Sequence, residues 1–428
     1  MALIHQDSKP SISSQVDLFS LPFTSTTVDM SLYAETKPLV SIASNGKIDF
    51  RILPSASHYL DAEDSFLYLK CKVVKEDGSN FAATDDYSVS NSPLHSMFSQ
   101  VDVYLNNQPV SMGNSTYSYK SYFENLFKNS FDHRTEMLTG VFSPDTHDFV
   151  LEETNVGYKE RKAIVSESKE FELCGKLFVD LASQKRFILN DTSLLISLTR
   201  NKDAFAILSK TLKGKIIISD ASFFIRRHIL YPSITQSHQK LLEKGLNAKY
   251  PYVCSEVRNF IIPKGNSSFF EDNLFLGAVP ARIIVGMVLN KAFEGSFDEN
   301  PYKFEDFKLS QISMQINNIS VPFRPLTIDV SNNNYLLGYY LLYKCVSKMN
   351  NNRGLLFTPN AYVKGYTLFG FDINPLALTD SCMYLETSGS VKLQLSFSRP
   401  LAEAVTLLVY AESQKVMEID KQRQASTS

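Results

Sequence analysis

The stretch FSQVDVYLNN, Phe98 to Asn107, has a near copy far along the chain in LSQISMQINN, Leu309 to Asn318. In both stretches apolar side chains alternate with more polar ones, which is typical of a β-strand with one buried face. Each stretch ends in Asn-Asn, a pair that tolerates the left-handed backbone of a tight hairpin turn. A short second strand, QPVS or ISVP, follows. The sequence therefore predicts the same β-hairpin twice in one chain.

Three further features recur in the same order as the hairpins, at separations between 199 and about 216 residues. They are the strand ends Ile52–Pro54 and Ile261–Pro263, the Tyr-rich segments 119–127 and 335–343, and the strands LLISLTR (Leu194–Arg200) and LQLSFSR (Leu393–Arg399). One such pair is weak support, because short strands look alike. Four pairs in the same order favour two copies of one β-domain.

Most of the remaining chain has the pattern of short strands, for example SFLYLKCKVV, KGKIIISDASFFI and SVKLQLSFSR. Helical periodicity is confined to two segments. Apolar residues lie three and four positions apart between Tyr117 and Phe131, and a second helix is expected from Pro232. For the second helix, Ser233 and Gln236 have the spacing of a capping box, and Gly245 is its expected end. We therefore predict an all-β protein of two tandem eight-stranded antiparallel jelly rolls with a few short helices.

The expected domain organisation has four parts. Residues 1–46, rich in Ser, Thr and Pro, are predicted to be an extended N-terminal arm. Residues 47–232 form the first jelly roll, and residues 233–412 form the second, which begins with the linker helix. Residues 413–428 are predicted to be a polar C-terminal tail.

The composition fits a folded protein, since 44% of the 428 residues are hydrophobic and 21% are charged. A formal net charge of -2, without blocks of like charge, argues against tight binding of nucleic acid. A local basic face at Arg226, Arg227 and His228 is the weaker alternative to solvated charges. Five scattered cysteines without a C-x-x-C pair favour a reducing compartment. We expect neither a signal peptide nor a membrane span.

Motifs of known catalytic chemistry are absent from the sequence. There is no glycine-rich phosphate loop, no G-x-S-x-G and no H-E-x-x-H. The best acidic cluster, Asp61, Glu63 and Asp64, fits a solvated turn better than a metal site or a hydrolase site. The lack of Trp counts mildly against sugar binding, although 21 Tyr residues could substitute. We therefore expect a protein that is not an enzyme, with no catalytic, cofactor-binding or metal-binding residues.

Several of these segments together resemble the capsid proteins of Polinton-like and adintovirus-like elements, which also occur as uncharacterised proteins in animal genomes. The most specific segments are LHSMFSQVDVYLNN and, near the end of the sequence, VYAES and EID. The resemblance extends to SQVDLFSLPFTSTTV, HYLDAEDSFLYLKCKVVKEDG and YSYKSYFENLF. The resemblance covers about Val16 to Arg423.

The resemblance implies a double jelly-roll major capsid protein, of the lineage shared by tailless phages, adenoviruses and virophages. In that lineage three chains form a pseudo-hexagonal capsomer, and capsomers tile an icosahedral shell. The implied partners are further copies of this chain and a minor or penton capsid protein. The implied location is the virion capsid, after synthesis in the host cytoplasm and assembly in the nucleus or cytoplasm. A tandem β-sandwich module that binds glycans or a cell surface is the alternative function.

Overall fold

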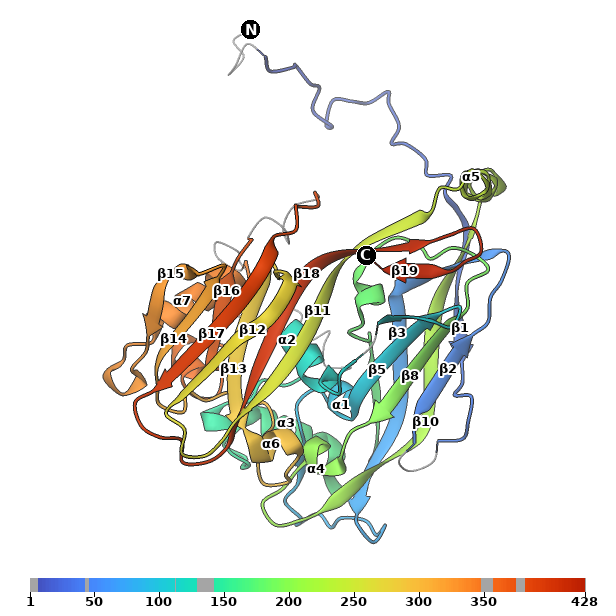
Figure 1. Ribbon diagram of the computed structural model, residues 1–428. Coiled ribbons are helices and arrows are strands. Elements are labelled where there is room, and N and C mark those ends of the chain that lie inside the picture. Colours follow the sequence, from blue (N-terminus) through green and yellow to red (C-terminus); the bar gives the residue numbers. More distant parts are fainter. Residues whose placement is uncertain are drawn as a thin grey trace.

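The computed structural model describes residues 7–42, 46–111, 113–128, 142–347, 357–374 and 382–427. Two β-sandwiches lie side by side, the first formed by the N-terminal half of the chain and the second by the C-terminal half (Figure 1). Short helices fill the space between them, and one helix, α5, stands apart at the end where the chain passes from the first sandwich to the second.

The first sandwich consists of two four-stranded antiparallel sheets. The strand order in one sheet is β1 (Val28–Thr36), β10 (Gly214–Leu230), β3 (His58–Lys75) and β7 (Glu170–Gly175). The order in the other is β2 (Ile48–Ile52), β8 (Leu194–Arg200), β5 (Phe98–Leu105) and β6 (Gln108–Ser111). A separate two-stranded ladder joins β4 (Ser88–Val89) to β9 (Ile207–Leu208).

The second sandwich repeats this arrangement strand for strand. One sheet has the order β11 (Ala248–Ile262), β18 (Val405–Ile419), β13 (Arg282–Leu289) and β16 (Leu368–Asp372), with β19 (Ala425–Thr427) added to β18. The other has the order β12 (Ser268–Ala278), β17 (Ser388–Phe397), β14 (Leu309–Ile316) and β15 (Ile319–Thr327). The prediction of an all-β chain with two tandem eight-stranded jelly rolls is confirmed.

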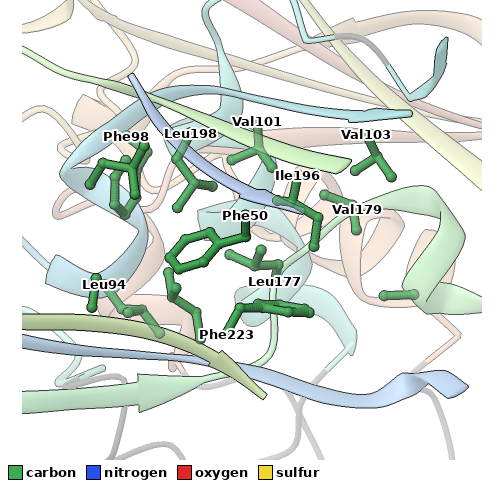
Figure 2. Packing of buried hydrophobic residues seen from close by; sticks show 14 of the residues in the cluster. Phe50, Leu94, Phe98, Val101, Val103, Leu177, Val179, Ile196, Leu198 and Phe223 are labelled. Atoms are coloured by element: carbon green, nitrogen blue, oxygen red, sulfur yellow. The ribbon is translucent and has the colours of Figure 1, made fainter. Parts of the chain in front are cut away.

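Side chains from both sheets meet in the core of the first jelly roll (Figure 2). Phe50 of β2 packs opposite Phe223 of β10, with 6.0 Å between the ring centroids. Val101 and Val103 of β5 point into the same core, as does Leu198 of β8. The alternation seen in FSQVDVYLNN is therefore the inward face of β5.

The repeated hairpins agree in detail. Both asparagines of each turn have positive φ, 46° and 67° at Asn106 and Asn107 and 50° and 65° at Asn317 and Asn318, as a type I′ turn requires. Buried and partly buried residues follow in the same order along all eight positions of β5 and β14. The pairing register also shifts at the same place, between the first and third residues of each strand.

Side chains explain why asparagine begins each turn. Asn106 Oδ1 accepts a hydrogen bond from the backbone N–H of Ser193 at 2.7 Å, and Asn317 Oδ1 accepts one from Ser390 at 3.1 Å. Ser193 lies directly before β8 and Ser390 is the third residue of β17, the strands that pair with the two hairpins. Each asparagine therefore makes the left-handed turn and also ties it to the neighbouring strand.

Two of the predicted correspondences need correction. Ile261 lies in β11, the counterpart of β1, whereas Ile52 ends β2, whose counterpart is β12, so these strand ends are not equivalent. The strands β8 and β17 do correspond, but the sequence match is shifted by two residues. Leu194 and Val391 pair with the last residues of β5 and β14, so Leu194 is equivalent to Val391 and not to Leu393.

Both predicted helices are present. Helix α2 spans Tyr117–Lys128, and positions 129–131 of the prediction lie outside the described residues. Helix α5 spans Pro232–Glu243 and ends in a Schellman motif: Gly245 has φ 80°, and its N–H and that of Leu246 bond back to Leu242 and Leu241. The capping box is wrong, because the N-cap is Tyr231, which makes no side-chain capping bond.

The remaining helical segments are short connections within or between the sandwiches. They are α1 (Pro93–Ser96), α3 (Val156–Val165), α4 (Asp203–Ala206), α6 (Asn290–Glu294), α7 (Leu336–Cys345), α8 (Pro359–Tyr362) and the 3-10 turns His147–Phe149, Ser166–Ser168, Asp180–Ser183 and Val330–Asn332.

The sheets bear on the predicted domain limits. Val28–Thr36 of the expected arm pairs with β10, and β18 runs past residue 412 into the expected tail, where β19 pairs with it. We therefore propose an arm of about 27 residues, a first jelly roll from β1 to β10, and a second from β11 to β19, with α5 as the linker.

Candidate functional site

The junction between the jelly rolls is the most extensive structure outside the two sandwich cores. It is built on the sheet of β11, β18, β13 and β16, both faces of which are covered. Ile283 and Val285 of β13 point into the second sandwich, while Ile284 and Val288 belong to a separate apolar cluster on the other face. That cluster includes residues of α2 and of α7, so a helix from each jelly roll covers the same sheet.

Aromatic side chains of α2 form the centre of the junction. The Tyr122 ring stacks on Tyr302 with 4.2 Å between centroids and 5° between planes. Phe123 lies 5.3 Å from Phe304 and 5.5 Å from Tyr410, measured between ring centroids. These rings bury a large apolar area, which is the main source of stability in such an interface. The two jelly rolls are therefore joined by a core rather than by a flexible linker.

Polar contacts fix the position of α2 on the second jelly roll. Asn114 Nδ2 donates to the carbonyl oxygen of Val257 at 2.7 Å. Lys120 forms an ion pair at 2.6 Å with Asp180 of the first jelly roll, and Asp180 in turn accepts the backbone N–H of Ser255 in β11 at 3.3 Å. Burial alone lowers the pKa of Lys120, but the charges of Asp180 and Glu124 outweigh it and raise the pKa above its ordinary value. Lys120 is therefore held in its charged form.

A second ion pair in the junction is completely buried. Arg161 Nη2 lies 2.7 Å from Asp145 Oδ1, and both side chains are fully inaccessible. The other guanidinium donors reach the carbonyl oxygens of Val89 and Ser143. Tyr366 of the second jelly roll donates to the carbonyl oxygen of Asp145 at 3.0 Å. Removing one member of such a pair costs about 3–5 kcal/mol, so the pair stabilises the first jelly roll. The hydrogen bond from Tyr366 then joins this network to the second jelly roll.

A third ion pair lies at the edge of the same cluster. Arg282 Nη1 contacts Glu412 Oε2 at 2.9 Å, and Tyr410 donates to Glu412 at 2.6 Å. Burial opposes the charge on Arg282, but Glu412 outweighs it and raises the pKa of the guanidinium. A crevice of about 420 Å³ is lined by this pair together with Lys176 and Phe178 of the first jelly roll.

The acidic cluster predicted from the sequence is a strand irregularity. Asp61, Glu63 and Asp64 lie in β3, where the register with β10 shifts. Asp61 Oδ1 accepts the backbone N–H groups of Glu63 and Asp64, while Asp64 accepts the hydroxyl of Tyr33. The Asp61 and Asp64 carboxylates therefore satisfy local backbone and side-chain donors, as expected for a turn-like segment. Among the described residues, no group of three His, Cys, Asp or Glu side chains is arranged to hold a metal ion.

One arrangement near this cluster was missed by the sequence analysis. His228 Nδ1 lies 2.7 Å from Ser31 Oγ, and His228 Nε2 lies 3.3 Å from Asp61 Oδ2. The three side chains come from the adjacent strands β1, β10 and β3, and their order matches that of a hydrolase triad. Ser31 and His228 lie directly opposite each other in the β1–β10 ladder, where polar side chains commonly pair across strands. A polar ladder on the sheet face is the better description.

The predicted basic face around Arg226 is also part of this sheet face. Arg226 lies over the ring of Tyr33, 4.6 Å from its centroid, and 3.9 Å from Asp64. His228 stacks on Phe187 with 4.1 Å between centroids. Of the three residues of the predicted basic face, Arg226, Arg227 and His228, two therefore already contact carboxylates or aromatic rings. These contacts weaken the positive field that binding of a nucleic-acid backbone needs.

All five cysteines are free thiols. Cys71 and Cys345 are buried, and burial raises the pKa of Cys71 to about 12. Cys71 is therefore an inert core residue. Cys382 is exposed.

The glycan-binding alternative requires exposed aromatic rings near one another. Within the described strands of the two sandwiches, the exposed phenylalanines Phe270 and Phe323 lie in β12 and β15, the two opposite edges of one sheet. They do not form one platform for a sugar ring. No described helix is long and apolar enough to cross a membrane.

A signal for the junction was present in the sequence but was not used. RIIVGMVL (Arg282–Leu289) and VTLLVYA (Val405–Ala411) are nearly continuous apolar runs, and almost every residue in them is buried. Such runs are typical of strands covered on both faces. They could have indicated that one sheet of the second jelly roll has a further layer on it.

Comparison with known proteins first concerns the sequence. No model of a known protein family matches the chain. An uncharacterised protein of Caenorhabditis elegans, F54H12.2, is 23% identical over 422 residues, which cover 94% of this chain and 98% of that protein.

Solved structures with a similar fold come from viruses. A chain of the Sputnik virophage structure has a TM-score of 0.60 at 12% identity and covers 100% of this chain and 94% of its own. PBCV-1 VP54 has a TM-score of 0.60 at 8% identity over 96% and 99%. The mavirus major capsid protein has 0.56 at 11% identity over 100% and 97%. At such low identities the likeness establishes the fold, which is that of double jelly-roll major capsid proteins.

Proposed function

We propose that this protein is a structural major capsid protein and that it acts without catalysing a reaction. The carrying observation is that two jelly rolls of the same strand order are fixed side by side by a buried junction. The similarity in fold to the mavirus major capsid protein along the whole chain supports the same role. The sequence resemblance supports an origin in a Polinton-like or adintovirus-like element.

The proposed assembly is a homotrimer. Two similar domains per chain give a trimer six similar edges, so a three-fold object can occupy positions with six neighbours in an icosahedral shell. This geometry requires the two jelly rolls to keep a constant relative position. The hydrogen bond from Tyr366 to Asp145 and the Tyr122–Tyr302 stack both cross between the jelly rolls and support that rigidity. A minor or penton capsid protein would fill the five-fold positions, and the location would be the virion.

Light scattering after size-exclusion chromatography tests this proposal. We expect a species of three times the 48.3 kDa chain mass, and negative-stain images with a hexagonal outline. A protein that stays monomeric at high concentration would refute the trimer. Replacement of Ser31 by Ala is the matched test for a hidden hydrolase, because loss of an esterase activity in that variant alone would overturn the non-enzymatic part of the proposal.

A further inference from the structure

The segment Val16–Phe23, with the sequence VDLFSLPF, carries more exposed apolar surface than a solvated arm needs. Phe19 and Phe23 are 99% and 107% exposed, and Leu18 and Leu21 are 76% and 91% exposed. Each such side chain gains about 1.5–3 kcal/mol on full burial. Contiguous exposed apolar residues of this kind mark an interaction site. In Figure 1 the arm leads away from both jelly rolls.

A groove of matching character lies beneath α5. Its volume is about 680 Å³, within the range of sites that hold several apolar groups. The lining includes Tyr59, Leu230, Leu241, Leu242, Leu246 and Tyr250. Leu241 and Leu246 are exposed, and the Schellman motif at the end of α5 places them on the same side of the chain reversal. The single chain therefore leaves both an apolar segment and an apolar groove uncovered.

Charge at the rim of the groove complements the arm. Lys185, Arg186 and Lys249 line it, whereas Asp17 is the charged residue within Val16–Phe23. An acidic apolar segment thus meets an apolar groove with a basic rim. Such complementarity favours one orientation of a bound segment and suppresses others.

The position of the arm indicates which chain supplies the segment. Thr27 lines the groove, and its carbonyl oxygen accepts the N–H of Tyr231 at 3.3 Å, so each arm starts at the lip of its own groove. From there the arm extends outward with its apolar side chains unburied (Figure 1). We propose that Val16–Phe23 of one chain docks in the α5 groove of a second copy. This inference rests on the proposed self-assembly and names a surface that carries it.

Cross-linking between two different chains tests the proposal directly. One full-length chain carries Phe19→Cys and the other carries Leu241→Cys, both with the exposed Cys382 replaced by Ser. The two are co-expressed with different tags and treated with a short bismaleimide. We expect a cross-linked pair that contains both tags. Ile12→Cys is the matched control, because Ile12 is an exposed apolar residue of the same arm outside the segment.

Each result decides between defined outcomes. A two-tag product with Phe19→Cys, and only a trace with Ile12→Cys, supports the proposal. Cross-linking within a monomer that carries both cysteines would mean that the arm folds back on its own chain and would overturn it. If trimers form but neither the two-tag product nor the cross-link within one chain is found, the inference is overturned and the proposed function remains intact. If no assembly forms at all, both are overturned. As a second measurement, Phe19→Asp should reduce the assembled fraction and Ile12→Asp should not.

Discussion

Replacement of Leu126 by Asn tests whether the junction is a true core. Leu126 lies in α2 and is fully buried in the cluster shared by the two jelly rolls. Loss of its apolar burial costs about 1.5–3 kcal/mol, and an amide buried without a partner adds about 1–3 kcal/mol. The expected loss is therefore roughly 2.5–6 kcal/mol, a large part of the 5–15 kcal/mol that typically separates folded from unfolded proteins.

Urea unfolding followed by circular dichroism measures this loss, and the yield of soluble protein gives a second readout. Leu126→Ala separates the cavity from the polar group, since both variants lose apolar contacts but only Asn brings an amide. Leu337→Asn is the control, because Leu337 lies in α7 but is 42% exposed, and surface changes usually stay within about 0.5 kcal/mol. If Leu126→Asn unfolded at the same urea concentration as Leu337→Asn, the junction would not be a stabilising core.

Three further predictions concern the turns, one histidine and the thiols. Asn106→Ala should destabilise the protein by about 2 kcal/mol, because a left-handed Ala is strained and the hydrogen bonds to the next strand are lost. Asn106→Gly should cost about half as much, because Gly is not strained there. The same changes at Asn317 should behave alike, and equal urea midpoints for the Ala and Gly variants would contradict the turn argument. Burial lowers the pKa of His95 to about 3, so as the pH falls below about 6.5 the unfolded chain takes up the proton before the folded protein does. About 2 kcal/mol of stability should therefore disappear by pH 5. If the free energy of unfolding of His95→Gln fell with pH as steeply as that of the unchanged protein, this explanation would be refuted. Iodoacetamide at pH 8 should modify the exposed Cys382 and spare Cys71, whose pKa is raised to about 12; peptide mass spectrometry showing equal labelling would contradict the burial of Cys71.

Local sequence predicted the hairpins well because their determinants are local. A type I′ turn needs two residues that accept positive φ, and Asn-Asn supplies them in both copies. The alternation of apolar and polar residues along β5 was a less reliable guide to which side chains are buried. Asp102 was expected on the polar face of β5, but it is buried, with Gln100 Nε2 and the N–H of Gly113 donating to its carboxylate. Such tertiary partners are not visible in the sequence of the strand.

The strand ends around Pro54 and Pro263 misled the comparison for a related reason. Proline ends strands wherever the ladder stops, since it lacks an N–H donor. Apolar residues followed by proline therefore mark the end of some strand but not which one. β1 was missed because it is an edge strand of the sheet with mostly exposed or partly exposed side chains, so it lacks a clear apolar face.

The differences between the two copies carry the functional argument, because the hairpins are the same and the helices after them are not. α2 follows the first hairpin and packs on the sheet of the second jelly roll, whereas α7 follows the second hairpin and packs on that same sheet, which is its own. The corresponding sheet of the first jelly roll keeps an outer face with charged side chains, such as Lys70 paired with Glu170. A duplicated domain with two equivalent helices would tend to extend into an open row of domains, each helix covering the next sheet. Here α7 covers the sheet of its own jelly roll instead, so both helices pack on one sheet and join the two jelly rolls.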